Sequence, residues 1–171
     1  NTLANDVSGT LAIAGSGRYT GLTTVTNAGT VTVASGGVLD GAAYWQTAGT
    51  TTNAGTLSMT SDLSVNGGSL SNTATLTAAS GLVAASGSLA NSGTALFSGS
   101  LTNAGGVSNT AGTLTVGTSL TNSGSISLSG GLLGVTTTLS NTGTVTQTGG
   151  TLSAATLSNL AAGTFNANGG S

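Results

Sequence analysis

One short motif recurs along the chain at nearly constant spacing and restricts the fold more than any other feature. An Asn stands two residues after an apolar residue or Thr, usually with Gly or Ala two residues later. The Asn positions are 5, 27, 53, 72, 91, 103, 122, 141 and 159, at intervals of 22, 26, 19, 19, 12, 19, 19 and 18 residues. A period of about 19 residues predicts a solenoid in which each repeat forms one coil.

Within a repeat, apolar and polar residues alternate with a period of two. In residues 120–128 one set consists of Leu120, Asn122, Gly124, Ile126 and Leu128, and the intervening set is Thr and Ser. Such alternation is typical of strands rather than helices. Three apolar positions recur per repeat, as in Val145, Leu152 and Leu157. They predict three short strands in each coil.

The residues between these apolar positions indicate tight corners and a continuous backbone ladder. Gly pairs at 36–37, 67–68, 130–131 and 149–150 permit the positive φ angles of sharp turns, and Pro is absent. The pattern predicts one all-β domain over residues 1–171, a right-handed parallel β-helix (β-solenoid) of about nine coils. Its coils should be irregular in residues 1–53 and 91–122.

The second irregular region leaves two registers open, because Asn109 is an alternative marker. Residues 91–122 divide either into intervals of 12 and 19 or into intervals of 18 and 13. In either case one turn is short. We therefore expect a bend or a missing side between Phe97 and Val107.

Charge is almost absent from the chain, which restricts its partners. Charged residues form 2% of the sequence, Arg18 is the single cation, and the net charge is −2. Nucleic acids and anionic membrane surfaces require several Lys or Arg residues, so neither is an expected partner. No apolar run approaches the length of a membrane span. The sequence also contains no Cys.

The residue types that usually support catalysis or metal binding are missing. There is no His, Glu or Lys, so the many Ser and Thr hydroxyls lack a general base. The carboxylates of Asp6, Asp40 and Asp62 fall in three separate repeats, whereas oxygen-ligand metal sites need converging carboxylates. We expect a non-enzymatic protein without catalytic residues, cofactor or metal.

The recurring Asn residues are expected to have a structural role. Side-chain amides stacked coil over coil at a corner can each satisfy the next. The predicted Asn ladder contains Asn27, Asn53, Asn72, Asn91, Asn122, Asn141 and Asn159.

Tyr44 and Trp45 are the candidate ligand contacts. They are adjacent, so on a strand one side chain points inward and the other outward. An outward aromatic ring could stack on a sugar, although packing beneath the loop of a long coil is the commoner arrangement.

Outward Thr and Ser residues form a second candidate surface. The segments are Thr30-Val31-Thr32, Thr56-Leu57-Ser58, Thr75-Leu76-Thr77, Ser125-Ile126-Ser127 and Thr144-Val145-Thr146. Aligned hydroxyls would form a flat grid that resembles the Thr-x-Thr face of β-solenoid ice-binding proteins, interrupted at Leu96 and Gly106. The alternative is that Thr and Ser simply favour strands and tolerate solvent.

The complete repeat resembles those of filamentous haemagglutinins and related autotransporter-type adhesins. The resemblance lies in Asn141-Thr-Gly143-Thr-Val145 followed by Gly149-Gly150-Thr-Leu152, and in Asn53-Ala-Gly55-Thr-Leu57 followed by Gly67-Gly68-Ser-Leu70. It covers most of residues 50–160. It implies a secreted bacterial β-helix that projects binding regions from the cell surface.

Together these observations predict a structural or adhesive β-solenoid outside a bacterial cell, with glycans or a host surface as partners. One alternative is a subunit that associates with itself, end to end or laterally, into an extracellular fibre or biofilm matrix. A second alternative is an ice-binding solenoid that uses the Thr and Ser columns.

Overall fold

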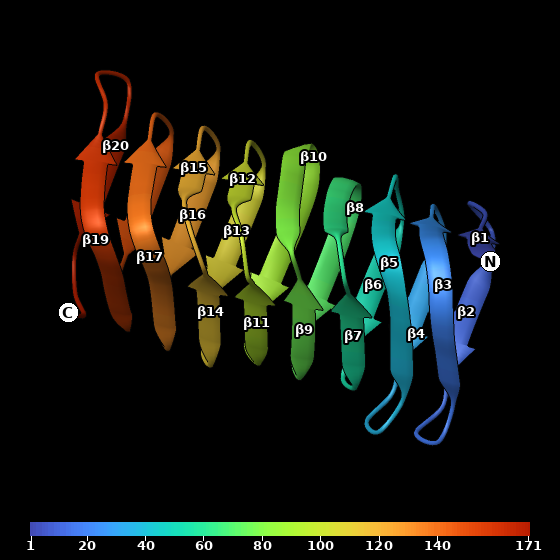
Figure 1. Cartoon of the computed structure of the whole chain (residues 1–171). Helices are drawn as coiled ribbons and strands as arrows, with labels where there is room; N and C mark the ends of the chain where they lie inside the picture. Colours follow the sequence, from blue (N-terminus) through green and yellow to red (C-terminus); the bar gives the residue numbers. More distant parts are fainter.

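The regular structure of the protein is entirely β-strand. The computed structural model describes residues 1–171, and its twenty strands belong to a single sheet (Figure 1). Figure 1 shows the coils side by side, from β1 at one end of the row to β20 at the other. Every strand is paired in parallel with the strand one coil further on, as between residues 2–5 and 24–27. The predicted all-β solenoid of about nine coils is confirmed.

Each coil has three sides, which stack into three faces of the rod. Face A consists of residues 2–5, 24–27, 43–46, 62–65, 80–83, 101–103, 120–122, 138–141 and 156–159. Face B consists of residues 10–13, 30–33, 50–53, 69–72, 88–91, 106–109, 125–128, 144–147 and 164–167. Face C consists of residues 18–22, 38–41, 56–59, 75–78, 94–97, 113–116, 132–135 and 151–154.

Fourteen strands lie on one face each. On face A these are β1 (Thr2–Asn5), β12 (Leu101–Asn103) and β15 (Leu120–Asn122). On face B they are β2 (Thr10–Ile13), β4 (Thr30–Val33), β6 (Thr50–Asn53), β13 (Gly106–Asn109), β16 (Ser125–Leu128), β18 (Thr144–Gln147) and β20 (Thr164–Ala167). On face C they are β7 (Thr56–Met59), β9 (Thr75–Ala78), β11 (Thr94–Phe97) and β14 (Thr113–Val116).

Six longer strands bend across a corner and contribute to two faces. Four run from face C to face A: β3 (Arg18–Asn27), β5 (Val38–Gln46), β17 (Leu132–Asn141) and β19 (Thr151–Asn159). Two run from face A to face B: β8 (Asp62–Asn72) and β10 (Ser80–Asn91). The register shifts within several of these strands, for example between Val83 and Ser86, which is how one strand turns the corner.

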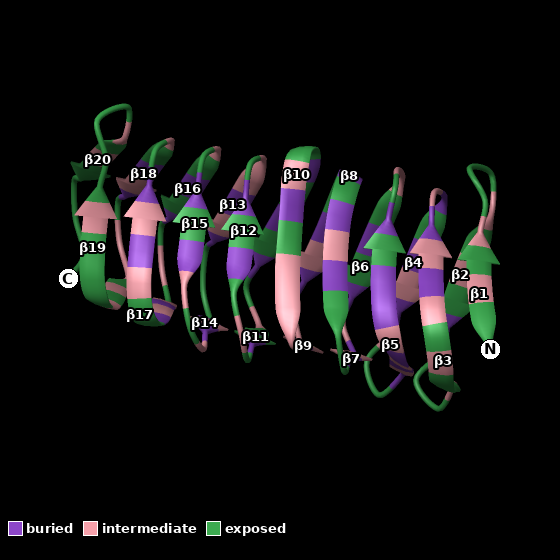
Figure 2. Cartoon of the chain, turned by 45° about the horizontal axis from the view of Figure 1, so that its top comes forward, coloured by how far each residue is buried: buried purple, intermediate pink, exposed green.

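Alternating side chains fill the interior of the rod. In β16 Ile126 and Leu128 are buried while Ser125 and Ser127 are exposed, as the alternation in residues 120–128 predicts. Figure 2 shows the same alternation of buried and exposed bands along many strands. The buried apolar residues form one core cluster of 28 side chains. Its members stack in columns, as with Leu57 and Leu76 on face C.

The Gly pairs lie at corners where successive coils approach closely. One member of each predicted pair has a positive φ, as at Gly68 with φ 72°. A Cβ atom at Gly68 would lie 2.0 Å from the carbonyl oxygen of Gly49 in the preceding coil. Both the backbone conformation and the lack of space therefore require Gly at this corner.

The predicted long and short coils are not present, because paired residues keep nearly constant separations. Asn27 pairs with Gln46 and Val33 pairs with Asn53, so the 26-residue interval from Asn27 to Asn53 spans one coil and one additional side. The prediction of a bend or missing side between Phe97 and Val107 is also wrong. The sides β11, β12 and β13 follow one another there without omission.

Candidate functional site

The recurring Asn residues lie in two columns rather than one. The first column is at corner AB, where face A leads into face B. There Asn5 donates through Nδ2 to Oδ1 of Asn27 at 2.8 Å, and Asn103, Asn122, Asn141 and Asn159 continue the pattern at 2.7 Å per step. Gln46, Val65 and Val83 occupy the intervening coils.

The second column is at corner BC, where face B leads into face C. Asn53 donates to Asn72, Asn72 to Asn91 and Asn91 to Asn109, at 2.7, 2.8 and 2.7 Å. This arrangement resolves the two registers left open for residues 91–122. Asn91 and Asn109 are partners at corner BC, 18 residues apart, whereas Asn103 and Asn122 are partners at corner AB, 19 residues apart.

Each ladder amide is fully occupied by the protein. Nδ2 of Asn122 donates to Oδ1 of Asn141 at 2.7 Å and to the carbonyl oxygens of Thr144 and Gly124, both at 3.2 Å. No buried side-chain nitrogen or oxygen of the structure lacks a hydrogen-bond partner. The ladder amides therefore hold coil to coil and leave no free group for a ligand.

Tyr44 lies inside the rod, in the coil where the Asn column changes corner. Its phenol shares a hydrogen bond with Thr51, which in turn donates to Oε1 of Gln46 at 2.5 Å and accepts from Nδ2 of Asn27 at 3.3 Å. Burial raises the pKa of Tyr44 to about 12. Tyr44 is 0% exposed, so it cannot touch a ligand outside the rod.

Trp45 points outward from face A and is 45% exposed. The register places Ser64 beside it in the next coil and Leu82, 36% exposed, one coil further. Asp62 stands on the same face, two residues before Ser64. Trp45 thus lies on an open, flat surface, and the sequence signals for Leu82 and Asp62 were too isolated to link them to it.

Face B presents two outward columns of hydroxyl groups, which we call the hydroxyl columns. They contain Thr30, Thr32, Thr50, Thr52, Ser69, Ser71, Ser88, Ser108, Ser125, Ser127, Thr144 and Thr146. Face B carries no charged residue. The columns therefore form a flat, neutral and regularly spaced surface.

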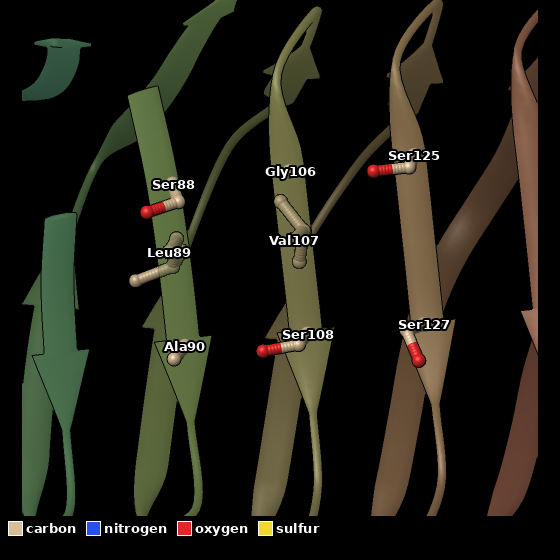
Figure 3. A pocket seen from close by; sticks show the side chains of 8 residues that line it. All are labelled: Ser88, Leu89, Ala90, Gly106, Val107, Ser108, Ser125 and Ser127. Carbon is tan, nitrogen blue, oxygen red and sulfur yellow. The ribbon is translucent and has the colours of Figure 1, made fainter. Parts of the chain in front are cut away.

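The hydroxyl columns are interrupted in the middle of the rod. Gly106 stands between Ser88 and Ser125 in one column, and Ala90 precedes Ser108 in the other. Figure 3 shows the four surrounding Ser side chains and the gap at Gly106. The missing side chains leave a shallow depression of about 280 Å³.

The predicted Thr and Ser grid is divided between two faces. Thr56, Ser58, Thr75 and Thr77 lie on face C, where Thr77 donates to Ser58 at 3.1 Å. Leu96 interrupts this second grid and is 39% exposed. A depression of about 420 Å³ at Gly134 interrupts it again. Face B is therefore the more continuous of the two surfaces.

The few ionisable side chains are separated in space. Asp6 follows β1, Asp40 lies on face C opposite Ser58, and Asp62 lies on face A opposite Ser80. No group of three or more His, Cys, Asp or Glu side chains is positioned to hold a metal ion. The structure has no helix long and apolar enough to cross a membrane.

Comparison with known proteins adds no assignment. No protein-family model, no curated protein and no solved structure matches the chain. What the geometry establishes is the architecture: the chain is a repeat protein that forms a parallel β-solenoid.

Proposed function

We propose that the protein is a non-enzymatic structural and adhesive element of a bacterial cell surface. The observation that carries the proposal is the division of labour between the two sides of every strand. Inward Asn and apolar residues hold the coils together, and the outward positions form long neutral surfaces with one exposed Trp. Such a rod displays binding surfaces at fixed intervals. The resemblance of its repeats to those of haemagglutinin-type adhesins supports the extracellular location.

Binding to surfaces tests this proposal directly. Fluorescently labelled protein is titrated onto immobilised glycans and onto host cells. Saturable binding that survives moderate salt supports adhesion, because a chain with a net charge of −2 has little electrostatic attraction to lose. Absence of saturable binding to every glycan and cell type would contradict the adhesive role.

Ice binding is the second candidate, and the hydroxyl columns favour it. Two parallel columns on a flat sheet repeat every coil, at about 4.8 Å along the rod. Thr52→Tyr on face B should lower thermal hysteresis several-fold, because the bulky ring prevents flat contact. The matched control is Thr94→Tyr, an equally exposed position on face C. No thermal hysteresis at high protein concentration removes this candidate.

Assembly into a fibre stays a prediction. In the last coil Leu157 and Leu160 are 43% and 46% exposed, and such apolar side chains favour association between copies. Electron microscopy of the purified protein distinguishes isolated short rods, which would contradict assembly, from longer fibres with an axial repeat.

A further inference from the structure

An apolar strip crosses three consecutive coils of face A. Trp45, Ser64 and Leu82 occupy equivalent outward positions in β5, β8 and β10. Trp45 and Leu82 are 45% and 36% exposed, and the smaller Ser64 lies between them. The two apolar side chains are therefore separated by two coils, about 10 Å along the rod axis.

A carboxylate with a fixed orientation borders this strip. Asp62 begins β8, pairs with Ser80 of β10, and is exposed. The Ser61 hydroxyl donates to Oδ2 of Asp62 at 3.1 Å, and the Ser80 hydroxyl donates to Oδ1. A carboxylate can accept about four hydrogen bonds, so lone pairs remain available toward solvent. The site thus combines an aromatic ring with an oriented acceptor.

This combination matches the chemistry of a sugar. The apolar face of a pyranose ring packs on an indole, and its equatorial hydroxyls donate to carboxylates. We propose that Trp45, Leu82 and Asp62 form a binding site for a neutral, linear oligosaccharide that lies along the rod axis. One ring stacks on Trp45, the next ring lies toward Leu82, and Asp62 accepts hydroxyl hydrogens from their edges.

The charge distribution defines the class of oligosaccharide. The single cation of the chain, Arg18, lies in the first coil on face C, and Asp62 would repel a carboxylate or sulfate group. Uronate-containing or sialylated chains should therefore bind more weakly than neutral chains. The proposal rests on the adhesive function and specifies its ligand class and site.

Trp45 is the only Trp in the chain, so its intrinsic fluorescence reports on this site alone. The protein is titrated with cellohexaose and chitohexaose as neutral probes and with an oligogalacturonate of equal length as the anionic probe. We expect a saturable fluorescence change with at least one neutral probe and a markedly weaker response to the anionic one.

Matched substitutions identify the contacts. Asp62→Asn should weaken binding of the neutral probe by about tenfold, since a hydrogen bond to a charged group is lost. Leu82→Ser should weaken it several-fold. The controls are Asp40→Asn and Leu96→Ser on face C, a carboxylate and a comparably exposed Leu that should change affinity less than twofold.

The outcomes separate this site from the proposed function. If neither neutral probe changes the fluorescence, if the anionic probe binds equally well, or if the controls match Asp62→Asn and Leu82→Ser, the site is wrong. Trp45→Ala, with its fold verified by circular dichroism, then decides the wider question. Surface binding that persists in Trp45→Ala leaves adhesion intact and places it elsewhere, whereas absence of surface binding by the unaltered protein overturns both proposals.

Discussion

Asn122 shows what one buried amide contributes to the rod. It accepts from Asn103 at 2.7 Å, donates to Asn141 at 2.7 Å, and is 0% exposed. Removing it leaves polar atoms of both neighbours without a partner in the interior, which is costly.

We therefore expect Asn122→Ala to lower the free energy of unfolding by about 2–4 kcal/mol. Thr121→Ala, on the exposed side of the same strand, should cost less than about 1 kcal/mol. Urea unfolding followed by circular dichroism measures both variants. Equal losses would mean that the ladder is not a specific source of stability.

Tyr44 predicts an alkaline limit to stability. Its phenol titrates at about 12 in the folded protein, against 10.0 for an unperturbed Tyr. Above pH 10 the unfolded chain releases this proton while the folded protein keeps it. Stability that is fully present below pH 10 is therefore lost as the pH rises toward 12, by about 2–3 kcal/mol.

Urea midpoints measured between pH 9 and pH 12 test this dependence. Tyr44→Phe should remove most of the slope, at a cost of about 1 kcal/mol near neutral pH for the lost hydrogen bond to Thr51. Tyr19→Phe, at a 44% exposed position, should retain the slope. A slope that is unchanged in Tyr44→Phe would contradict the assignment.

At the scale of one strand, orientation decides tolerance to charge. In β16 the side chain of Ile126 is buried and that of Ser127 is exposed. Ile126→Asp would place a carboxylate in the core and should prevent folding or cost more than about 4 kcal/mol. Ser127→Asp should fold normally. Circular dichroism spectra and thermal melts of both variants check this, and equal tolerance would refute the inward and outward assignment.

Strand orientation was predictable because alternation is local, but side-chain packing between coils was not. Gly81 faces the core between Leu63 and Leu101 in the register. A Cβ atom there would lie 2.5 Å from Cε1 of Phe97, a residue on another face. The sequence shows Gly81 as an ordinary Gly inside a strand, because the aromatic ring that requires its small size is 16 residues away.

At the scale of the whole molecule, the sequence predicts the number of coils but not the corner that each Asn occupies. The two corners use the same local geometry: the backbone N–H of Gly55 donates to Asn53 at corner BC and that of Gly105 donates to Asn103 at corner AB, both at 3.2 Å. Nothing within the motif itself distinguishes the corners. The intervals of 26 and 12 residues therefore resemble changes in coil length.

Deletions of whole coils test the stacking. Residues 123–141 are the 19 residues between equivalent points of adjacent coils, so their removal should leave a folded rod shorter by one coil, about 4.8 Å. Removal of residues 28–53 ends at the other corner and joins face A directly to face C, so this variant should fail to fold. Circular dichroism and small-angle X-ray scattering measure both. Folding of both variants would show that the corners are interchangeable.

The change of corner gives this regular rod distinguishable positions along its length. The backbone repeats almost identically in every coil, whereas the Asn column rotates by one third of a turn at the third coil and returns in the sixth, where Asn103 and Asn109 share one coil. A molecule that moved along the rod would therefore meet a different local chemistry at each of these two phase shifts. Trp45 lies at the first of them.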